Sequence, residues 1–336
     1  MKKSLKRILA LTLSLMLAFT LLSGCGSQSA ADDGAGDADT GDTYKVAFLP
    51  TDMSMTFASW LADELVTAFD EYPDMELTVL DSQNKLETQI SNIETCVAQG
   101  YDYIIVLPIE PAATDAIMEG YIADGIPMMN INLDDFGAEH ASSVIANPYD
   151  LGTVVAEYAK GLLADDANVV VLLGPSGNTD SIERRRAYEE IIFSGSNVTI
   201  LEEQLGDWEK SKGMELMENW IQVHGDKIDA VCSMNDAMAI GAYEAAKDAG
   251  VAENILFFGV DGLADAAVSI ADGELTATAL QDAQVMAKEA ARIVHEILTG
   301  ENAEGIEKVQ IPVTLITADN VQEFVDRYTA NGMLNG

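Results

Sequence analysis

The sequence has few cysteines and histidines, and this shortage excludes two classes of small protein. Cysteine occurs three times, at Cys25, Cys96 and Cys232. Cys96 and Cys232 stand among apolar neighbours in different parts of the chain, so we expect buried thiols without a disulfide. The three histidines are scattered, and no Cys/His cluster has the spacing of a zinc site. The sequence therefore predicts neither a disulfide scaffold nor a metal centre.

Positive charge is also scarce. Lysine and arginine number 18 against 56 aspartates and glutamates, which gives a formal net charge of −38. Nucleic-acid binding needs basic patches that neutralise phosphates, so this balance argues against a nucleic-acid partner. The excess of acid is typical of a solvated surface.

The common cofactor and nucleophile motifs are missing. The glycine-rich run Gly174-Pro175-Ser176-Gly177 lacks the features of a phosphate loop or a dinucleotide fingerprint, and no Gly-x-Ser-x-Gly elbow occurs. Acids follow several expected strands, namely Asp134, Asp135, Asp180 and Asp261. Such acids could act as a catalytic pair, but with 56 acids in the chain a few at loops are expected by chance. We expect no cofactor and no metal.

A long apolar run opens the chain. Lys2, Lys3, Lys6 and Arg7 precede the run Ile8–Leu22. A basic start, an apolar run of this length and small residues after it are typical of a secretory signal, and the run is too short for a comfortable membrane span. The ending Leu22-Ser23-Gly24-Cys25 resembles the lipobox of bacterial lipoproteins, which implies cleavage before Cys25 and a diacylglycerol on its sulfur. The plainer alternative is an ordinary signal peptide that contains a cysteine.

Residues 1–24 are thus predicted to be a signal peptide and residues 25–42 a flexible tether. The tether is almost all Gly, Ser, Ala and Asp and has no large apolar residue, so it cannot bury a core. About 290 residues remain, which is enough for two domains of ordinary size.

Apolar periodicity in this remainder alternates between strands and helices. Expected strands cover Tyr44–Pro50, Glu76–Leu80, Tyr103–Leu107, Pro127–Ile131, Asn168–Leu173, Val198–Leu205, Ile228–Cys232, Ile255–Val260 and Leu275–Ala279. Expected helices cover Phe57–Phe69, Gln89–Gln99, Ala112–Ala123, Leu151–Leu163, Glu183–Ile192, Lys210–Val223, a segment from Ala237, and Ala264–Ala271. The alternation predicts an α/β fold of doubly wound parallel sheets. So many strands are better split into two sheets, with a boundary near Asn147-Pro148.

The stretch Ile228–Gly241 gives the first sign of a ligand site. Its apolar start is typical of a short buried strand, and helical spacing of apolar residues begins at Ala237. Asn235 therefore stands at the carboxyl end of a strand, where a helix begins. Ligands of open α/β sheets bind at that edge, but a polar residue there can equally be only the N-cap of the helix. The pattern leaves both roles for Asn235 open.

Three motifs together resemble one known family. They are NDAMAIGA at Asn235–Ala242, FGVDG at Phe258–Gly262 and LDSQN at Leu80–Asn84. They are similar to those of the monosaccharide-binding proteins of ABC transporters, which have the type I periplasmic-binding-protein fold. The match covers essentially the whole mature chain, to the closing IPVTLITADN at Ile311–Asn320. The galactose/glucose-binding type is the most similar, and the ribose-binding type is next. Related repressors begin with a DNA-binding domain, whereas this chain begins with a secretion signal.

The resemblance implies a set of ligand-binding residues. Phe57 and Trp208 match the aromatics that cover the two faces of a sugar ring. Polar contacts are implied for Asn132, Asn178, Asp180, Arg184, Asn235, Asp261 and Gln281. A pyranose has two apolar C–H faces and a rim of hydroxyls, so aromatics suit its faces and charged or amide groups suit its rim. The plainer alternatives are a core role for Phe57, a turn acid for Asp261 and a hinge residue for Gln281.

Several features depart from the galactose/glucose type. Met55 stands where that type has an acid, and Asp52 is the nearest replacement. Asn178 replaces a histidine, and Gln281 replaces an asparagine. The calcium loop of that type has no counterpart, because Ala164–Asn168 is too short to hold one. The resemblance therefore implies a monosaccharide or a close polyol, with a galactose/glucose-like hexose favoured.

The leading interpretation is an extracytoplasmic lipoprotein on the bacterial cell membrane that binds a monosaccharide between two lobes and delivers it to the permease of an ABC importer. Residues 43–146 and 280–310 are expected to form one lobe, and 147–279 and 311–336 the other, with three hinge crossings between them. We expect a monomer without enzyme activity. The alternatives are a receptor of the same fold that signals, in chemotaxis or autoinducer-type sensing, and a secreted sugar-acting enzyme with paired carboxylates.

Overall fold

The computed structural model describes residues 43–132, 141–302 and 305–334. The predicted signal peptide, the lipobox with Cys25 and the tether lie outside these residues, as do Asp134 and Asp135. The elements described here belong to one compact unit, Gly41–Gly336. Among the described residues, no helix combines the length and the apolar character that a membrane span requires.

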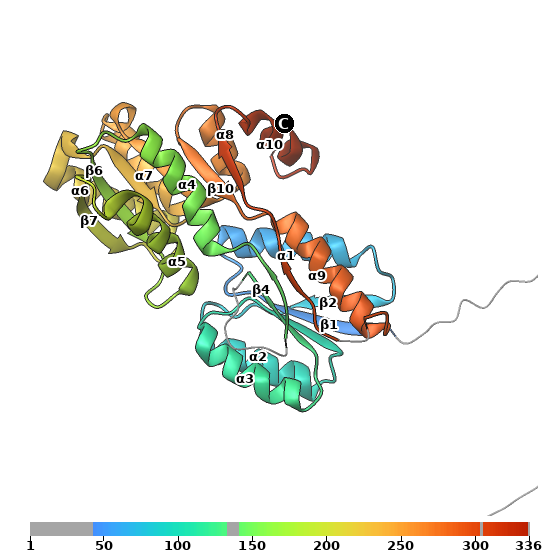
Figure 1. Cartoon of the computed structure of the whole chain (residues 1–336). Coiled ribbons are helices and arrows are strands. Elements are labelled where there is room, and N and C mark those ends of the chain that lie inside the picture. The colour runs from blue at the N-terminus through green and yellow to red at the C-terminus, as the bar shows by residue number, and fades with distance from the viewer. Residues whose placement is uncertain (1–42, 133–140, 303–304, 335–336) are drawn as a thin grey trace, which may run out of the picture. The chain divides into compact units, whose positions relative to one another are not determined.

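The strands form two six-stranded sheets (Figure 1). The first has the order β11-β5-β4-β3-β1-β2, with β1 Tyr44–Leu49, β2 Met75–Val79, β3 Tyr103–Val106, β4 Met128–Ile131, β5 Ser142–Ile145 and β11 Lys308–Gln310. The second has the order β12-β10-β9-β8-β6-β7, with β6 Asn168–Leu173, β7 Thr199–Leu205, β8 Ala230–Ser233, β9 Leu256–Asp261, β10 Ala277–Leu280 and β12 Thr314–Thr317. Neighbouring strands are parallel except β10 and β12, which are antiparallel. The predicted α/β class with two doubly wound sheets is confirmed, with one antiparallel edge strand added.

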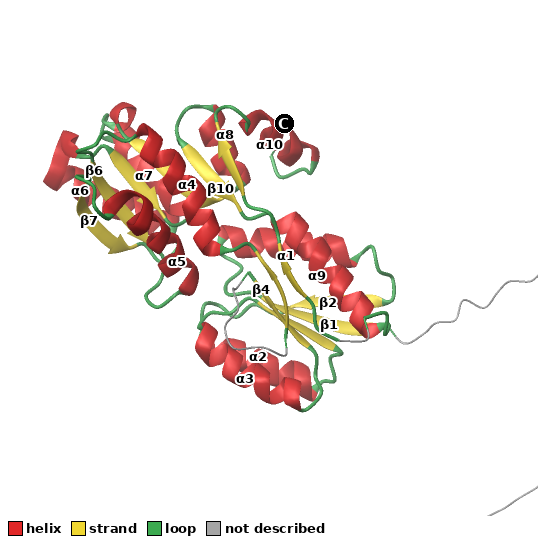
Figure 2. Ribbon diagram, in the orientation of Figure 1, coloured by secondary structure: helices red, strands yellow, loops and turns green. Residues whose placement is uncertain are grey.

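Helices cover the sheets on both faces (Figure 2). They are α1 Thr56–Phe69, α2 Leu86–Ala98, α3 Pro111–Ala123, α4 Pro148–Leu162, α5 Thr179–Tyr188, α6 Lys210–His224, α7 Asp236–Asp248, α8 Ala264–Ala271, α9 Ala283–Leu298 and α10 Val321–Ala330. The short π-helix η1 Glu189–Phe193 and the 3-10 helices η2 Gly225–Lys227 and η3 Ala252–Asn254 complete the set. In Figure 1, α1 and α9 lie on one face of the first sheet, and α2 and α3 lie on the other. In the second half, α4 packs against α5, and α6 packs against α7.

Strand β1, which lies between β3 and β2, shows why the strands of these sheets are rich in apolar residues. Val46 and Phe48 belong to the large core that also includes α1 and α9, whereas Ala47 and Leu49 belong to a separate cluster with residues of α2 and α3. All four are fully buried. A parallel strand that is covered on both faces has no solvent side, so its covered positions are apolar in succession.

The two cysteines in the described residues are both buried and unpaired. Burial raises the pKa of the Cys96 thiol to about 11 and that of Cys232 to about 12. The pKa rises because a thiol without water around it loses the solvation of its charged form. The expectation of buried thiols without a disulfide is confirmed for this pair.

The Asn147-Pro148 break is the start of a helix. The Asn147 side chain accepts hydrogen bonds from the backbone N–H groups of Tyr149 and Asp150, and Pro148 occupies the first turn of α4. Proline suits that place because its missing N–H has no partner within the helix. The pair also separates β5 of the first sheet from β6 of the second.

The chain passes between the two sheets three times: between β5 and β6, between β10 and β11, and between β11 and β12. No element was predicted after Ala279, and the structure has α9, β11, β12 and α10 in this part of the chain. In it, α9 packs against α1, and α10 packs against α8. The lobe boundaries at residues 146, 279 and 310 stay a prediction.

Two residues of α10, Tyr328 and Arg327, contact other elements. The hydroxyl of Tyr328 donates a hydrogen bond to the carbonyl oxygen of Gly262 at 2.5 Å, and the ring meets Trp60 of α1 edge-on, with centroids 6.0 Å apart. Arg327 pairs with Asp282 at the start of α9. The last helix is thereby tied to the turn after β9 and to both helices that cover one face of the first sheet.

Candidate functional site

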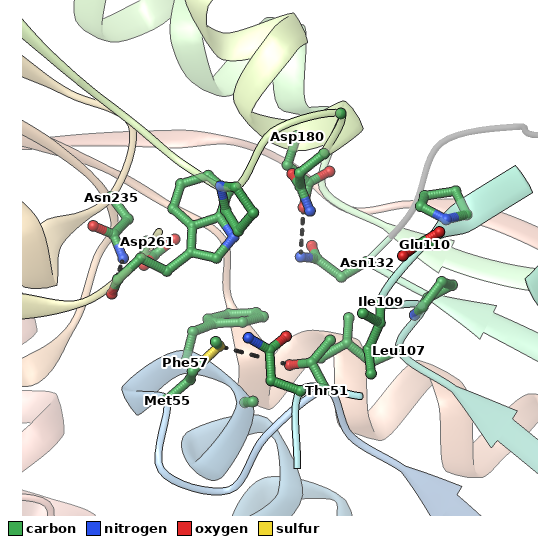
Figure 3. A pocket seen from close by; sticks show the side chains of 18 of the residues that line it. Thr51, Met55, Phe57, Leu107, Ile109, Glu110, Asn132, Asp180, Asn235 and Asp261 are labelled. Atoms are coloured by element: carbon green, nitrogen blue, oxygen red, sulfur yellow. Dashed lines mark hydrogen bonds between the residues drawn. The ribbon is translucent and has the colours of Figure 1, made fainter. Parts of the chain in front are cut away.

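A pocket of about 660 Å³ is lined by segments that follow the carboxyl ends of strands in both sheets. All nine residues implied by the sequence resemblance line it: Phe57, Asn132, Asn178, Asp180, Arg184, Trp208, Asn235, Asp261 and Gln281. Figure 3 shows Phe57 facing the pocket from one side, and Asp180, Asn235 and Asp261 from the other. The structure thus brings the set together, and its role toward a ligand stays a prediction.

Asn235 caps a helix and also lines the pocket, and its contact with a ligand stays a prediction. Its Oδ1 accepts a hydrogen bond from the backbone N–H of Met238 at 3.0 Å and so caps α7. Its Nδ2 donates to the carbonyl oxygen of Trp208 at 3.2 Å. An amide nitrogen carries two N–H groups, so the second one is available to a ligand in the pocket.

The α6–α7 contact explains why Asn235 and Trp208 meet. Trp208 precedes α6, and Asn235 precedes α7. A Cβ atom at Gly241 of α7 would lie 2.1 Å from the carbonyl oxygen of Lys210, so the backbones approach more closely than any other residue would permit. The close packing brings the starts of the two helices, and the residues before them, to one edge of the pocket.

Arg184 is buried and holds a closed cluster of polar groups. Its Nη1 donates to the carbonyl oxygen of Met234 at 2.7 Å and lies 3.3 Å from Asp261 Oδ1, and its Nη2 donates to Gln281 Oε1 at 3.0 Å. Gln281 Nε2 donates to the same Asp261 oxygen at 2.7 Å. The cluster fixes the Asp261 carboxylate in one orientation. Arg184 Nε is buried without a hydrogen-bond partner among the described residues, so it is a donor that a ligand could satisfy.

Asp180 and Arg184 share one helix. The sequence predicted a helix from Glu183, with Asp180 just before it, but α5 begins at Thr179. Asn178 is its N-cap, with Oδ1 accepting from Ser181 N at 3.1 Å. The earlier start has a physical reason: an asparagine cap and an acid in the first turn both favour a helix N-terminus. Asp180 and Arg184 therefore lie one turn apart on the same helix.

Burial raises the pKa values of two acids in this region. Burial raises the pKa of the Asp261 carboxyl well above its ordinary value, and the Arg184 guanidinium opposes that rise. Burial also raises the pKa of Asp236 to about 6, although the hydroxyl of Thr278 and backbone N–H groups favour its charged form. Asp236 Oδ1 accepts from Thr278 Oγ1 at 2.6 Å, and its Oδ2 accepts from Leu263 N at 2.9 Å.

Asp261 has an unusual backbone conformation, with φ of 128°. Such a φ is costly for a residue with a side chain and persists only where its surroundings hold it. The turn is held by the backbone bond from Gln281 N to Asp261 O at 3.2 Å and by Gly262 N, which donates to Thr278 Oγ1 at 3.2 Å. Asp236 also accepts a hydrogen bond from the backbone N–H two residues after Asp261. Several hydrogen bonds therefore hold the backbone conformation that aims Asp261 into the pocket.

Trp208 stands on strained backbone above a glycine. Asp207 and Trp208 have φ of 51° and 68°. A Cβ atom at Gly174 would lie 2.2 Å from the Trp208 ring, so the indole lies directly on the backbone after β6. Arg184 Cζ lies 5.6 Å from the ring centroid. The indole is half-buried and lines the pocket, as expected for an aromatic that meets a ligand rather than one enclosed in the core.

The first sheet contributes Phe57 and Asn132 from the predicted set. Phe57 is the second residue of α1, and its ring meets Trp60 edge-on with centroids 6.1 Å apart. Asn132 follows β4 with φ of 59°, and its Nδ2 lies 3.5 Å from Asp180 Oδ2 (Figure 3). Asn132 Oδ1 is buried and has no hydrogen-bond partner among the described residues. It is an acceptor that a ligand hydroxyl could satisfy.

The suggestion that Asp52 replaces the acid at the Met55 position is wrong for this structure. Asp52 Oδ1 accepts from the backbone N–H of Ser54 at 2.8 Å and from its hydroxyl at 2.6 Å, and Asp52 is not part of the pocket lining. Aspartate readily bonds to the backbone two residues later, which keeps its carboxylate within its own loop. Met55 itself lines the pocket.

Further lining residues were not among the sequence-derived candidates. They are Thr51, Thr56, Ala58, Asn84, Leu107, Pro108, Ile109, Glu110, Pro111, Ala112, Ala113, Pro175, Ser176, Gly177, Ala237 and Leu263. Many are apolar, so no side-chain chemistry singled them out. Their position was the available signal, because loops after β1, β2 and β3 lie at the same edge of the sheet as Asn132. Among the described residues, no group of His, Cys, Asp and Glu could hold a metal ion.

Comparisons with known proteins agree with this fold. The family model described as periplasmic binding protein domain matches residues 46–302. The putative rhizopine-binding protein of Rhizobium meliloti is 32% identical over 258 residues, which cover 74% of this chain and 82% of that protein. The ribose import binding protein of Bacillus subtilis is 30% identical over 243 residues, which cover 72% and 77%. A solute binding protein of an ABC transporter from Bacillus halodurans, solved with bound myo-inositol, superimposes with a TM-score of 0.80 at 26% identity, covering 87% of this chain and all of that one.

Proposed function

The chain belongs to the periplasmic binding protein domain family, and from this premise we propose that it is an extracytoplasmic receptor for a monosaccharide or a closely related polyol. One observation carries the proposal: a pocket at the carboxyl ends of both sheets in which the cluster of Arg184, Asp261 and Gln281 shares the lining with the aromatic rings of Phe57 and Trp208. Relatives that are named for ribose import and rhizopine binding, and the structure with bound myo-inositol, support a small ligand rich in hydroxyls.

The chemistry of the lining suits such a ligand. Phe57 and Trp208 offer flat apolar surfaces for the C–H faces of a ring. Arg184 Nε is a buried donor and Asn132 Oδ1 a buried acceptor without partners among the described residues, so hydroxyls between them could satisfy both. Each such bond to a charged group adds more to affinity than a bond between neutral groups, and each unsatisfied group costs free energy in the empty pocket.

Residues that follow both sheets line the pocket, so we infer that the ligand is held between two lobes that move about the three crossings of the chain. In this proposal the closed form presents the ligand to the permease of an ABC importer. Small-angle scattering checks it, since closure should lower the radius of gyration when ligand is added. An unchanged radius with saturating ligand would contradict lobe movement.

Binding without chemical change is part of the proposal. Asp261 is committed to Arg184 and Gln281, which leaves it positioned to accept a hydrogen bond rather than to exchange protons with a substrate. The secreted-enzyme alternative requires turnover. Recovery of the ligand unchanged after long incubation is therefore expected, and release of a product would favour the enzyme.

A panel of ligands in a thermal-shift assay tests the receptor function. D-Galactose, D-glucose, D-ribose, xylitol and myo-inositol represent a hexose, a pentose, an acyclic polyol and a cyclic polyol. A ligand at about 100 times its Kd stabilises the folded chain by about 2.7 kcal/mol, which is several degrees in Tm. We expect at least one such shift, with the galactose/glucose-like hexose as one candidate. No shift from any monosaccharide or polyol in a wider panel would contradict the proposal.

A lipid anchor at Cys25 is the second part of the proposal. Its support is the basic and apolar start of the chain and the ending Leu22-Ser23-Gly24-Cys25. Metabolic labelling with a radioactive fatty acid should mark the wild-type chain and leave Cys25→Ala unlabelled. A chain that is secreted into the medium without label would indicate an ordinary signal peptide.

A further inference from the structure

The two ends of the pocket differ in chemistry. Figure 3 shows Asn235 and Asp261 at one end and Leu107 and Ile109 across the open space from them. The segment Leu107-Pro108-Ile109, which we name the apolar wall, follows β3 and lines the pocket. Leu107 and Pro108 are buried and Ile109 is half-buried. Asn84 and Glu110 also line the pocket, and both are exposed.

The backbone of the apolar wall has no free N–H donor. Leu107 N donates to the carbonyl oxygen of Leu49 at 3.1 Å, and Ile109 N donates to Gln89 Oε1 at 3.1 Å. Pro108 has no N–H group. Both the side chains and the amide nitrogens of the wall are therefore unable to bond to a ligand hydroxyl.

Gln89 holds the wall in this position. The side chain is fully buried in α2, and its Nε2 donates to the carbonyl oxygen of Leu107 at 2.9 Å. Its Oε1 also accepts from the hydroxyl of Thr114 at 3.2 Å, so the wall and the first turns of α3 are fixed together. A wall held at both of its ends does not turn a backbone donor toward the pocket when a ligand enters.

These observations decide which ligand fits. A hydroxyl packed against the side chains of the wall would lose its bonds to water and find no side-chain or N–H partner there, which costs affinity. A methyl group in the same place would bury apolar surface, which favours binding. The pocket volume of about 660 Å³ lies within the range of small-molecule sites, so a sugar ring with a substituent can be accommodated.

We infer that the ligand is a sugar or polyol that carries an apolar substituent at the edge away from Asn235 and Asp261, namely a methyl or methoxy group or a deoxygenated terminal carbon that packs against the wall of Leu107, Pro108 and Ile109. The inference rests on the proposed function and adds the substituent to it. The polar end of the pocket holds the hydroxylated edge of the ring, and the apolar wall selects what lies opposite.

Isothermal titration of the full chain with matched ligand pairs tests the inference. The pairs are myo-inositol and its mono-O-methyl ethers, D-galactose and 6-deoxy-D-galactose, and D-ribose and 5-deoxy-D-ribose. In at least one pair, the methylated or deoxygenated member should bind at least tenfold more tightly than its parent. If the parent binds as tightly or more tightly in every pair, the inference is wrong while the proposed function stands. If no member of any pair binds and the wider panel gives no thermal shift, the proposed function fails and the inference fails with it.

A pair of isoleucine variants locates the substituent. Ile109→Thr places a hydroxyl on the wall, and it should reduce the preference for the substituted member by at least threefold. Ile182→Thr is the matched control, because Ile182 is 53% exposed on α5 and does not line the pocket. The control should keep the wild-type ratio of affinities. A wild-type ratio in Ile109→Thr would overturn the placement of the substituent at the wall, and the thermal midpoint of each variant shows that it is folded.

Discussion

Both terminal nitrogens of Arg327 bind the carboxylate of Asp282, with Nη1 2.7 Å from Oδ2 and Nη2 2.6 Å from Oδ1. The same carboxylate accepts the backbone N–H groups of Gln284 and Val285 and caps α9. Asp282 also follows Gln281, which belongs to the pocket cluster. One side chain therefore joins the last helix, the start of α9 and the edge of the pocket.

The two roles of Asp282 can be separated by substitution. Asp282→Asn keeps a good helix cap and loses the charge, whereas Asp282→Ala loses both. We expect the alanine variant to lose roughly 1–2 kcal/mol more unfolding free energy than the asparagine variant, since a lost cap costs about that much. Urea denaturation of both variants measures the difference. Equal losses would show that the ion pair with Arg327 carries the whole effect.

Trp208 and Gly174 give a linked pair of predictions about the pocket. Trp208→Ala should weaken ligand binding by roughly 1–3 kcal/mol and leave folding largely intact, as a stacking residue would. Gly174→Ala should also weaken binding, because its Cβ atom would lie 2.2 Å from the indole and displace it. Calorimetry gives the affinities, and near-ultraviolet circular dichroism reports the position of the ring.

If Trp208→Ala instead unfolds, while its folded fraction binds normally, the indole belongs to the core. Gly250→Ala is a useful control for the glycine substitution, because Gly250 also has an unusual φ of 72° but nothing within 4 Å of its Cβ position. It should lose stability without losing affinity.

The cluster around Arg184 predicts strong effects on affinity. Alanine at Arg184 or Asp261 should cost at least about 2 kcal/mol in binding, because the partner charge is then left in a desolvated site. Alanine at Asp180 should cost a similar amount, because it removes a charged acceptor from the lining of the pocket. Arg184→Met tests the electrostatic part, since it keeps much of the side-chain volume and removes the guanidinium that opposes the raised pKa of Asp261. In that variant, binding should weaken as the pH falls, and from a higher pH than in the wild type. Titrations at several pH values measure the profile, and coincident profiles would contradict the pairing.

Asp236 predicts how stability varies with pH. Its pKa is about 6 in the folded chain and 3.8 in an ordinary setting, so the folded state retains a proton that the unfolded state has released between those values. Its contribution to the unfolding free energy therefore falls as the pH rises from about 4 to about 6, by up to about 3 kcal/mol, and is constant above that range.

The difference in unfolding free energy between the wild type and Asp236→Asn isolates this contribution from that of the other acids. From pH 4 to pH 6, the unfolding free energy of the wild type should fall relative to that of the variant. A difference that does not vary between pH 4 and pH 7 would show that Asp236 titrates normally in the folded chain.

Local pattern was sufficient for most of the fold and for the second half of the pocket. Strands such as Asn168–Leu173 are apolar at every position after the first and bounded by polar breaks, so their limits agree with the structure. Asn235 follows β8, and Asp261 is the last residue of β9. Because consecutive strands of a parallel sheet end at the same edge, the sequence alone predicts that the two residues lie at one edge. β5, with its two serines at Ser142 and Ser143, has too little apolar character to be recognised alone.

The part of the pocket that the first sheet contributes depends on contacts between residues far apart in the chain, which no local pattern predicts. The apolar wall is a ligand surface only because Gln89, 18 residues before Leu107, binds its carbonyl oxygen. The direction of Asp52 depends on whether its carboxylate prefers its own loop or the pocket, and the residue type permits both. Nor does any local pattern predict that Tyr328, near the end of the chain, bonds to Gly262. Such contacts join segments far apart in the chain, so periodicity carries no sign of them.

Because Cys96 and Cys232 are buried, this chain is a suitable scaffold for a fluorescent reporter of ligand binding. Thiol-reactive dyes attack the thiolate, and burial that raises the pKa of Cys96 to about 11 and of Cys232 to about 12 leaves almost none at neutral pH. In a chain that starts at Gly26, a cysteine introduced at Ser176 on the lining of the pocket would then be the one thiol that reacts. A dye placed there would change its emission as the ligand enters, without any background from the native sulfurs.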